Sequence, residues 1–406
     1  MNYDLGIIGG GPAGYTAAFQ ARQKGLSVVL FEKDKIGGVC LNRGCIPTKA
    51  ILHSAELFEE MKCASNLGIN AENISVDYTK VIERKNSIVE KLRKSLELSL
   101  KNAGVTVICA EALIENGKII ANGETYECGK IITATGSVPR DFEGLRFDHK
   151  FILSSDDILE MTTLPKSIAI IGSGAIGIEW ARIFSAFGVE VSIIELAEHL
   201  LPLADIEVSK RIERIFKSKK IKMYLSNGVE KIESRTVTLK SGDVLEPECV
   251  LLAVGRTPAG TACSLALGDA CGKIQLAHFA IKQAISEMTG IEFDESLVPS
   301  VVYGCPEIAW VGKREQDLEE GTYQKSNILV SALGKSHCDN CTEGFIKLLA
   351  QNGKIVGAHI VAKEASALIQ QITIAMQNNM TIDDLKKVCF AHPTYSEGIF
   401  ESLFRL

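Results

Sequence analysis

The sequence predicts an α/β protein in which one βαβ unit occurs twice and a mixed α+β domain follows. An apolar strand, a glycine-rich turn, a helix and a second apolar strand with an acidic end begin near residue 3 and again near residue 167. From about residue 297 the pattern changes to several strands followed by two helices. A chain of 406 residues is long enough for two or three such domains.

The two repeats share both their glycines and their acidic residue. They read YDLGIIGGGPAG at 3–14 and SIAIIGSGAIG at 167–177, with three glycines in each: Gly9, Gly11 and Gly14, then Gly172, Gly174 and Gly177. The strands that follow, LSVVLFE and VEVSIIE, end in Glu32 and Glu195. In both copies the acidic residue lies 23 residues after the first glycine.

This arrangement is typical of Rossmann-like dinucleotide-binding domains. The first glycine allows a tight turn, the second lets a pyrophosphate approach, and the third lets the helix pack closely on the strand. The helix N-terminus binds the phosphates, and the acidic residue accepts hydrogen bonds from ribose hydroxyls. Because Glu195 would repel a 2′-phosphate and the next residues contain no arginine, the second unit favours NAD over NADP. Two plain turns in an α/β sheet are the alternative, but they do not explain the shared register.

Periodicity predicts the remaining elements. Residues 78–104 alternate apolar and charged positions at helical spacing and end on a glycine, which predicts an exposed amphipathic helix. Further strands are predicted within 105–114, 130–137 and 220–254, and in the last domain at 301–304, 345–350 and 354–362. We therefore expect four parts: nucleotide-binding domains at 1–150 and 151–258, a return to the first domain at 259–296, and a C-terminal domain at 297–406.

Composition excludes several function classes. A net charge of −6 argues against a nucleic acid or an anionic membrane as partner. No apolar run reaches transmembrane length without charges, and the N-terminus lacks the basic and apolar blocks of a signal peptide. Twelve scattered cysteines are too few for a disulfide scaffold, so we expect mostly free thiols in a reducing cytoplasm.

Against that background, one close cysteine pair stands out in GGVCLNRGCIPTK, residues 37–49. In an ideal α-helix, residues five apart have Cα atoms roughly 8.6 Å apart, whereas a disulfide needs about 4.4–6.8 Å. A bridge between Cys40 and Cys45 therefore requires a distorted turn, which the glycines and the asparagine of this segment permit. Two buried thiols that never pair are the alternative. Two dinucleotide sites nearby favour a redox-active cysteine pair, since the pair would be a third electron carrier beside the two bound dinucleotides.

A second pair of closely spaced cysteines gives weaker evidence for a functional site. Cys338 and Cys341, with His337 beside them, have metal-like spacing. A structural zinc site needs four ligands, and no second pair lies nearby in the sequence. We therefore interpret this spacing as coincidence in a loop and assign no metal.

The segment at 37–49 resembles the active-site signature of the class I pyridine nucleotide-disulfide oxidoreductases, and within that family the dihydrolipoamide dehydrogenases. The resemblance covers nearly the whole chain and includes both fingerprints. Its further motifs are TATGS at 133–137, AVGRTP at 253–258, LGDACGKIQLAH at 267–278, YGCPEIAWVG at 303–312 and HPTYSE at 392–397. It implies an FAD-binding and an NAD-binding Rossmann-like domain, followed by a C-terminal α+β dimerisation domain.

The resemblance also implies roles for matching residues. Cys40 would exchange with substrate, and Cys45 would lie beside the flavin as a charge-transfer thiolate. Lys49 would lie near the flavin ring and pair with Glu179, which would approach the nicotinamide. Further contacts are implied, to FAD at Ala112, Gly136, Asp269 and Ala277, and to NAD at Gly255.

The residue types of the HPTYSE segment suit proton transfer, independently of the family resemblance. Thiol exchange needs a thiolate, and histidine is suited to move that proton near neutral pH. Glu397 can orient the imidazole of His392 and stabilise its cation. His392 is far from Cys40 in sequence, and the family resemblance places this histidine across a dimer interface, so that two subunits share each site.

One stretch departs from the family. Only residues 257–268 separate Arg256 from Asp269, where the family has some tens of residues, including a β segment. Twelve extended residues span at most about 40 Å, so the crossing is possible without those strands. Either the lineage has shortened this connection, or the sequence was trimmed, or a segment is omitted and its flanks are joined. A natural shortening would weaken FAD retention and stability.

These observations together predict a flavoprotein that passes electrons between dihydrolipoyl groups and NAD through a Cys40–Cys45 disulfide and FAD. The expected partners are a second subunit and a lipoyl-bearing carrier domain of a 2-oxo-acid dehydrogenase or glycine-cleavage complex. Two alternatives stay open. One is a related NAD(P)H-dependent thiol–disulfide reductase with another substrate, and the other is a catalytically impaired flavoprotein.

Overall fold

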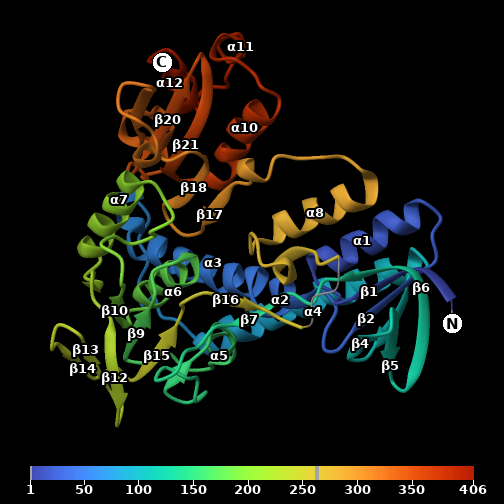
Figure 1. Cartoon of the computed structure of the whole chain (residues 1–406). Helices are drawn as coiled ribbons and strands as arrows, with labels where there is room; N and C mark the ends of the chain where they lie inside the picture. The colour runs from blue at the N-terminus through green and yellow to red at the C-terminus, as the bar shows by residue number, and fades with distance from the viewer. Residues whose placement is uncertain (1, 261–264) are drawn as a thin grey trace.

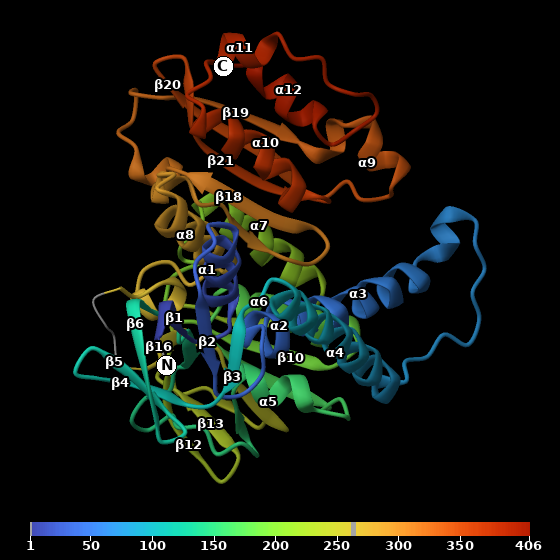
Figure 2. The same cartoon turned by 90° about the vertical axis from the view of Figure 1, so that its right-hand side faces the viewer.

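The computed structural model describes residues 2–260 and 265–406 (Figure 1). Residues 261–264, in the short connection before Asp269, lie outside the described residues. The C-terminal domain, orange to red in Figure 1, lies above the two nucleotide-binding units, and the view in Figure 2 shows the same arrangement.

The first βαβ unit forms the centre of a six-stranded sheet. Helix α1 (Pro12–Gln23) connects β1 to β2 as predicted, and these strands are parallel. In sheet order the strands are β3 (Thr106–Cys109), β2 (Val28–Glu32), β1 (Asn2–Ile8), β6 (Glu124–Thr133), β5 (Lys118–Ala121) and β4 (Ala112–Glu115). The first four are parallel and the last two antiparallel. The β1 core positions Leu5, Ile7 and Ile8 are buried, as a strand covered on both faces requires.

The second βαβ unit forms a five-stranded parallel sheet. Helix α6 (Ala175–Ala186) connects β9 to β10. In sheet order the strands are β11 (Lys222–Tyr224), β10 (Glu190–Ile194), β9 (Ser167–Ile171), β15 (Cys249–Leu252) and β8 (Ile152–Leu153). Helices α5 (Ser155–Glu160) and α7 (Ile206–Ser218) accompany it, with a small antiparallel sheet of β12 (Val229–Glu233), β13 (Thr236–Leu239) and β14 (Val244–Leu245). The repeat predicted from sequence is therefore confirmed.

Two helices join the units. α4 (Tyr78–Asn102) matches the predicted amphipathic helix, with Asp77 accepting a hydrogen bond from the Lys80 N–H at its start and Gly104 in the left-handed region after its end. α3 (Cys45–Lys62) packs against both α4 and α6, and Figure 2 shows α3 and α4 running together. The packing of α3 on α6 holds side chains from the two units close to each other. Among the described residues, no helix is long and apolar enough to cross a membrane.

The C-terminal domain is an antiparallel sheet with helices on it. In sheet order its strands are β17 (Ser300–Val302), β18 (Glu307–Gly312), β21 (Lys354–Ala362), β20 (Phe345–Gln351) and β19 (Gln324–Leu329). Its helices are α9 (Gly334–Cys338), α10 (Ala365–Gln377), α11 (Ile382–Lys386) and α12 (Glu397–Leu403). Two helices were predicted after the last strand, and the structure has three. The extra one, α11, is five residues long and depends on a capping box between Thr381 and Asp384, so it is too short to show periodicity.

The short connection returns the chain to the first sheet. β16 (Arg256–Pro258) pairs with β7 (Ser137–Pro139), and a parallel bridge then joins Ala266 to Thr133 at the end of β6. A 3-10 turn (Gly268–Cys271) leads into α8 (Ala277–Thr289), which packs on α1. Asp269 therefore lies at the first nucleotide-binding unit even though the connection is short.

Candidate functional site

Cys40 and Cys45 form a disulfide between two helices. Cys40 lies in α2 (Gly38–Arg43) and Cys45 is the first residue of α3. Gly44 breaks the helix between them, with φ −149° and ψ −109°. The break brings the two Cα atoms to 4.7 Å, inside the range that a disulfide needs. The predicted distorted turn is confirmed.

Local contacts fix this turn beside the first fingerprint. Asn42 Nδ2 donates hydrogen bonds to the carbonyls of Ile36 (3.0 Å) and Gly38 (2.9 Å). Gly38 has φ +60°, and a Cβ there would lie 2.6 Å from the Gly11 Cα, so the backbones touch. The disulfide is therefore held directly against the turn that is expected to bind the first dinucleotide.

Four residues after Cys45, Lys49 links the two nucleotide-binding units. Its Nζ lies 2.9 and 2.7 Å from the two carboxylate oxygens of Glu179, which is 5% exposed on α6. The Tyr303 N–H also donates to Glu179, at 3.0 Å, and the Tyr303 ring lies 4.5 Å from Lys49 Nζ. The predicted pairing of Lys49 with Glu179 is confirmed. Tyr303 was missed, because its contact uses a backbone N–H that no residue type reveals.

The first and third glycines of each fingerprint are explained by packing alone. A Cβ at Gly14 would lie 1.9 Å from the Gly9 carbonyl oxygen, and one at Gly177 would lie 2.1 Å from that of Gly172. Gly9 and Gly172 both have positive φ, at +107° and +98°. Neither position tolerates a larger residue, whether or not a nucleotide binds.

The second glycines differ from these. A Cβ at Gly11 would meet only the Gly38 Cα, at 3.7 Å, and one at Gly174 would have no atom within 4 Å. Each is the N-cap of its helix, and no side chain caps either helix. Free helix N–H groups beside a position without a Cβ suit a pyrophosphate. The two fingerprints therefore fit dinucleotides.

Both acidic residues lie at the predicted strand ends and bind the glycine turns. Glu32 accepts a 2.8 Å hydrogen bond from the Gly10 N–H. Glu195 accepts hydrogen bonds from both the N–H (2.8 Å) and the hydroxyl (2.7 Å) of Ser173, and one from the Ala197 N–H at 2.8 Å. These contacts hold each carboxylate beside its turn, where a ribose would bind.

The remaining predicted cofactor residues lie at several places in the fold. Asp269 accepts a 2.5 Å hydrogen bond from the Ser137 hydroxyl, and Arg256 Nε donates to the same hydroxyl at 2.8 Å. The other four begin elements or form turns: Ala112 begins β4, Ala277 begins α8, and Gly136 and Gly255 take positive φ beside the β7–β16 pair.

The C-terminal pair forms as predicted. His392 Nδ1 lies 2.7 Å from Glu397 Oε1, and the Thr394 N–H donates to the other carboxylate oxygen at 2.9 Å. The hydrogen bond to His392 lowers the pKa of Glu397. The His392 side chain is 77% exposed. Such a pair can accept a proton from a thiol brought to it from outside.

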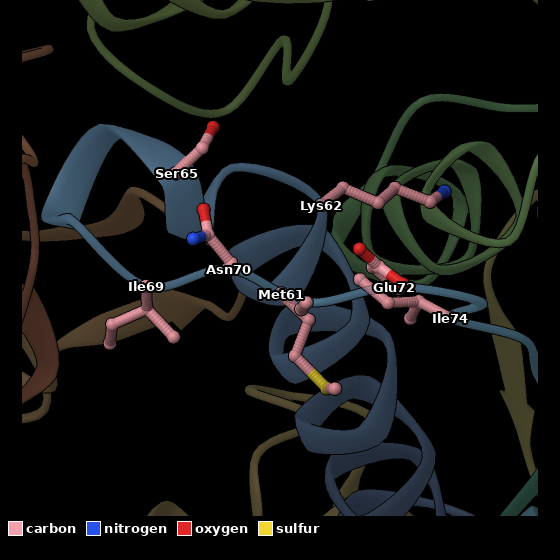
Figure 3. Close-up of a pocket in the computed structure, with 8 residues that line it drawn as sticks. Met61, Lys62, Ser65, Ile69, Asn70, Glu72 and Ile74 are labelled. Atoms are coloured by element: carbon pink, nitrogen blue, oxygen red, sulfur yellow. The ribbon is translucent and has the colours of Figure 1, made fainter.

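This pair and the disulfide are separated within one chain. In Figure 1 and Figure 2, α12 lies at the far side of the C-terminal sheet from α2. A single chain therefore does not bring His392 to Cys40. One hollow, at the far end of α3 (Figure 3), contains none of the predicted site residues and is lined by Met61, Lys62, Ser65, Ile69, Asn70, Ala71, Glu72 and Ile74. No metal-binding group of three or more ligands occurs in the described part of the chain.

Comparison with known proteins places this geometry in a family. Residues 3–273 match the family model described as pyridine nucleotide-disulphide oxidoreductase, and residues 298–403 match its dimerisation domain. The dihydrolipoyl dehydrogenase of Bacillus subtilis is 34% identical over 98% of this chain and 97% of its own. That of Chlamydia pneumoniae is 33% identical over 98% and 95%.

Solved structures show the same fold. The HOCl-induced flavoprotein disulfide reductase RclA from Escherichia coli has a TM-score of 0.87 and 25% identity, with 99% of both chains covered. LpdA from Mycobacterium tuberculosis has a TM-score of 0.92 at 24% identity, again over 99% of both chains. The family matches cover most of the chain, so this protein belongs to the pyridine nucleotide-disulphide oxidoreductase family.

Proposed function

We propose that this protein oxidises dihydrolipoyl groups to lipoyl groups with NAD as the electron acceptor. FAD and NAD are the cofactors of the family, and the two fingerprints fit them. The observation that carries the proposal is the Cys40–Cys45 disulfide held against the Gly11 turn, with the Lys49–Glu179 pair reaching from it to the second unit. We assign FAD to the first unit and NAD to the second.

The chain's own groups account for the thiol chemistry. A dihydrolipoyl thiolate attacks the Cys40 sulfur, the S–S bond breaks, and Cys45 leaves as a thiolate. The second substrate thiol then attacks the mixed disulfide and releases the oxidised product, which leaves both cysteines reduced. His392, oriented by Glu397, takes the proton of the attacking thiol. FAD held at the first unit would supply the electron transfer from the reduced cysteine pair to NAD at the second.

The partner subunit supplies the histidine in this proposal. His392 is exposed, and apolar side chains of the same domain are exposed too, among them Ile374, Val388 and Phe404. Such a surface suits the homodimer that the dimerisation-domain match supports. A lipoyl-bearing carrier domain of a 2-oxo-acid dehydrogenase or glycine-cleavage complex would deliver the substrate. We place the protein in the cytoplasm, because the described cysteines outside the disulfide are free thiols.

The test is NADH titration of the purified flavoprotein, followed by absorbance. We expect yellow protein that gains long-wavelength absorbance as NADH reduces the Cys40–Cys45 pair, and lipoamide-dependent NADH oxidation. Cys45→Ser should keep the yellow colour and lose both signals. Lipoamide reduction that survives this substitution unchanged would refute the proposal.

A second candidate is a disulfide reductase with another substrate, which the likeness to RclA favours. A panel of lipoamide, glutathione disulfide and other small disulfides separates the two. The ratio kcat/KM for lipoamide should exceed the others by at least about 100-fold if the dihydrolipoyl assignment is right. Purified protein that lacks FAD would instead support the impaired flavoprotein, through weakened retention at the short connection before Asp269.

A further inference from the structure

Two cysteines outside the redox disulfide lie in contact. The Sγ atoms of Cys305 and Cys341 are 3.7 Å apart, although the residues are 36 positions apart in sequence. Cys305 follows β17 in the turn to β18, and Cys341 lies between α9 and β20. We interpreted the spacing of Cys338 and Cys341 as coincidence, and the structure brings Cys341 to Cys305.

We propose that Cys305 and Cys341 are a second redox dithiol, which a small-molecule disulfide converts to a reversible Cys305–Cys341 disulfide. A disulfide needs its sulfurs about 2.05 Å apart, so these two must approach by about 1.7 Å. Cys305 is exposed and Cys341 half-buried, so a small reagent reaches both. This site is separate from the Cys40–Cys45 pair and needs neither its sulfurs nor a bound nucleotide.

The surroundings show which segment moves. The turn at Cys305 is fixed on both sides, because Arg182 Nη1 donates to the carbonyls of Tyr303 (3.2 Å) and Pro306 (2.6 Å). The Tyr303 N–H is in turn bound to Glu179. Cys341 lies in the loop after α9, where its own N–H donates to the Ser336 carbonyl at 2.8 Å. We therefore expect the Cys341 loop to close on Cys305, which leaves the Lys49–Glu179 pair in place.

The contact also sets the order of the exchange. The contact between the two sulfurs is the chief cause that lowers the pKa of Cys341, with Lys363 as a further cause. The same contact raises the pKa of Cys305. Cys341 is therefore the attacking thiolate.

The exchange then balances as follows. The Cys341 thiolate attacks one sulfur of the disulfide R–S–S–R, and the first R–S⁻ leaves. Once Cys341 is in a mixed disulfide it is no longer a thiolate, so the chief cause that raises the Cys305 pKa is gone. Cys305 loses its proton, attacks the Cys341 sulfur and expels the second R–S⁻. Two protein thiols become one disulfide, and one R–S–S–R becomes two R–SH.

The hollow next to Cys305 holds no more than about one water. A disulfide reagent therefore approaches the two sulfurs from the open surface, and glutathione disulfide is the probe.

The experiment uses the full-length flavoprotein, reduced with dithiothreitol, desalted and treated with glutathione disulfide. Trypsin should release residues 283–313 joined to residues 336–347 by a disulfide that dithiothreitol cleaves. Since 336–347 holds both Cys338 and Cys341, mapping is done in the Cys338→Ser background, which is also the matched control. We expect the yield of the Cys305–Cys341 disulfide in the Cys338→Ser variant to lie within about twofold of wild type, because the replaced residue, Cys338, is exposed and unpaired.

Single variants test the order of attack. Cys305→Ser should stop at a glutathione adduct on Cys341, because the resolving thiol is missing. In the reduced wild-type protein, where both thiols are present, iodoacetamide should form the adduct on Cys341 at least about tenfold faster than on Cys305, because Cys305 then has the higher pKa. Equal adduct rates would overturn the assignment of Cys341 as the attacking thiol. A link between Cys338 and Cys341 in wild type, or no cross-link in the Cys338→Ser variant, would overturn the proposal itself.

Discussion

Lys49 Nζ lies 2.7 Å from Glu179 Oε2, and this ion pair joins α3, the helix that begins at Cys45, to α6 of the second nucleotide-binding unit. The Glu179 side chain is 7% exposed and the Lys49 side chain 32%. A pair half-shielded from water is stronger than a surface pair, but burying its charges costs free energy as well. Its main role is therefore orientation of the two units, with stability as a measurable side effect.

The first prediction concerns this pair. Lys49→Met should lower the free energy of unfolding by about 2 kcal/mol, because it leaves the buried Glu179 carboxylate without its cation. Urea denaturation measures the loss, and a double-mutant cycle with Glu179→Gln isolates the coupling. Lys94→Met is the control, since it breaks the exposed Lys94–Glu90 pair of α4 and should cost no more than about 0.5 kcal/mol. If the free-energy costs of the two substitutions are strictly additive, the ion pair contributes nothing to stability.

The second prediction separates the two kinds of fingerprint glycine. Gly174→Ala should keep stability within about 0.5 kcal/mol, since its Cβ meets no atom, but should weaken NADH binding at least about tenfold. Gly177→Ala should destabilise by more than about 2 kcal/mol, because its Cβ would lie 2.1 Å from a carbonyl oxygen. Thermal unfolding and NADH titration on the same samples check both. Wild-type NADH affinity in Gly174→Ala would show that this glycine does not face the cofactor.

The third prediction concerns coenzyme choice. Wild-type protein should prefer NADH to NADPH, and Glu195→Gln should reduce that preference by about tenfold or more, because the charge opposing a 2′-phosphate is gone. The ratio of kcat/KM for the two coenzymes is the measurement. Glu198→Gln removes the same charge three residues later, at an exposed position, and should leave the ratio within about twofold. Equal changes of this ratio in both variants would mean that net charge sets the coenzyme preference, and not a local contact of Glu195 with the coenzyme.

Much of this molecule could be predicted from sequence because its constraints are local. The third glycine of each fingerprint is required by a carbonyl oxygen five residues earlier, and the cysteine pair is separated by one broken helix turn. Such short-range geometry leaves a fixed spacing in the sequence. The strands around the fingerprints are apolar on both faces, which gives continuous apolar runs.

The rest depends on contacts between distant segments. The Tyr303 backbone N–H donates to Glu179, and the Cys305 sulfur contacts that of Cys341. Both contacts join residues far apart in the sequence, so neither produces a recognisable spacing of residue types. β19 (Gln324–Leu329) was missed because only two of its residues are buried, which gives no clear alternation. The spacing of Cys338 and Cys341 was interpreted as coincidence, and it gave no sign that tertiary packing would bring Cys341 to Cys305.

The fourth prediction tests the shared site. Cys45→Ser and His392→Gln homodimers should each be inactive in dihydrolipoamide oxidation. If each site takes its cysteine from one subunit and its histidine from the other, mixing the two variants restores one intact site in every heterodimer. Random exchange should then recover about a quarter of wild-type activity. No recovery, with subunit exchange verified by differently tagged chains, would mean that each chain uses its own histidine.

The fifth prediction concerns pH and α3. Burial, followed by the nearby Glu307, raises the pKa of Glu56 from its ordinary 4.5 to about 7. Between these values the folded protein binds more protons than the unfolded chain, so stability falls as pH rises from about 4.5 to 7 and then levels off. Glu56→Gln removes this loss. The variant should therefore be more stable than wild type at pH 8 by about 1–2 kcal/mol, a figure reduced for the partial exposure of the carboxyl.

Glu60→Gln is the matched control for this variant, because Glu60 lies one turn later on α3 and is exposed. Its unfolding free energy should follow the wild-type pH dependence within about 0.5 kcal/mol. Chemical denaturation at pH 5, 6, 7 and 8 measures all three proteins. The expected result is that the Glu56→Gln and wild-type curves diverge from pH 5 to about 7 and then level off to a constant separation. Curves that stay parallel over the whole range would mean that Glu56 ionises at its ordinary pKa and that burial at this end of α3 carries no electrostatic cost.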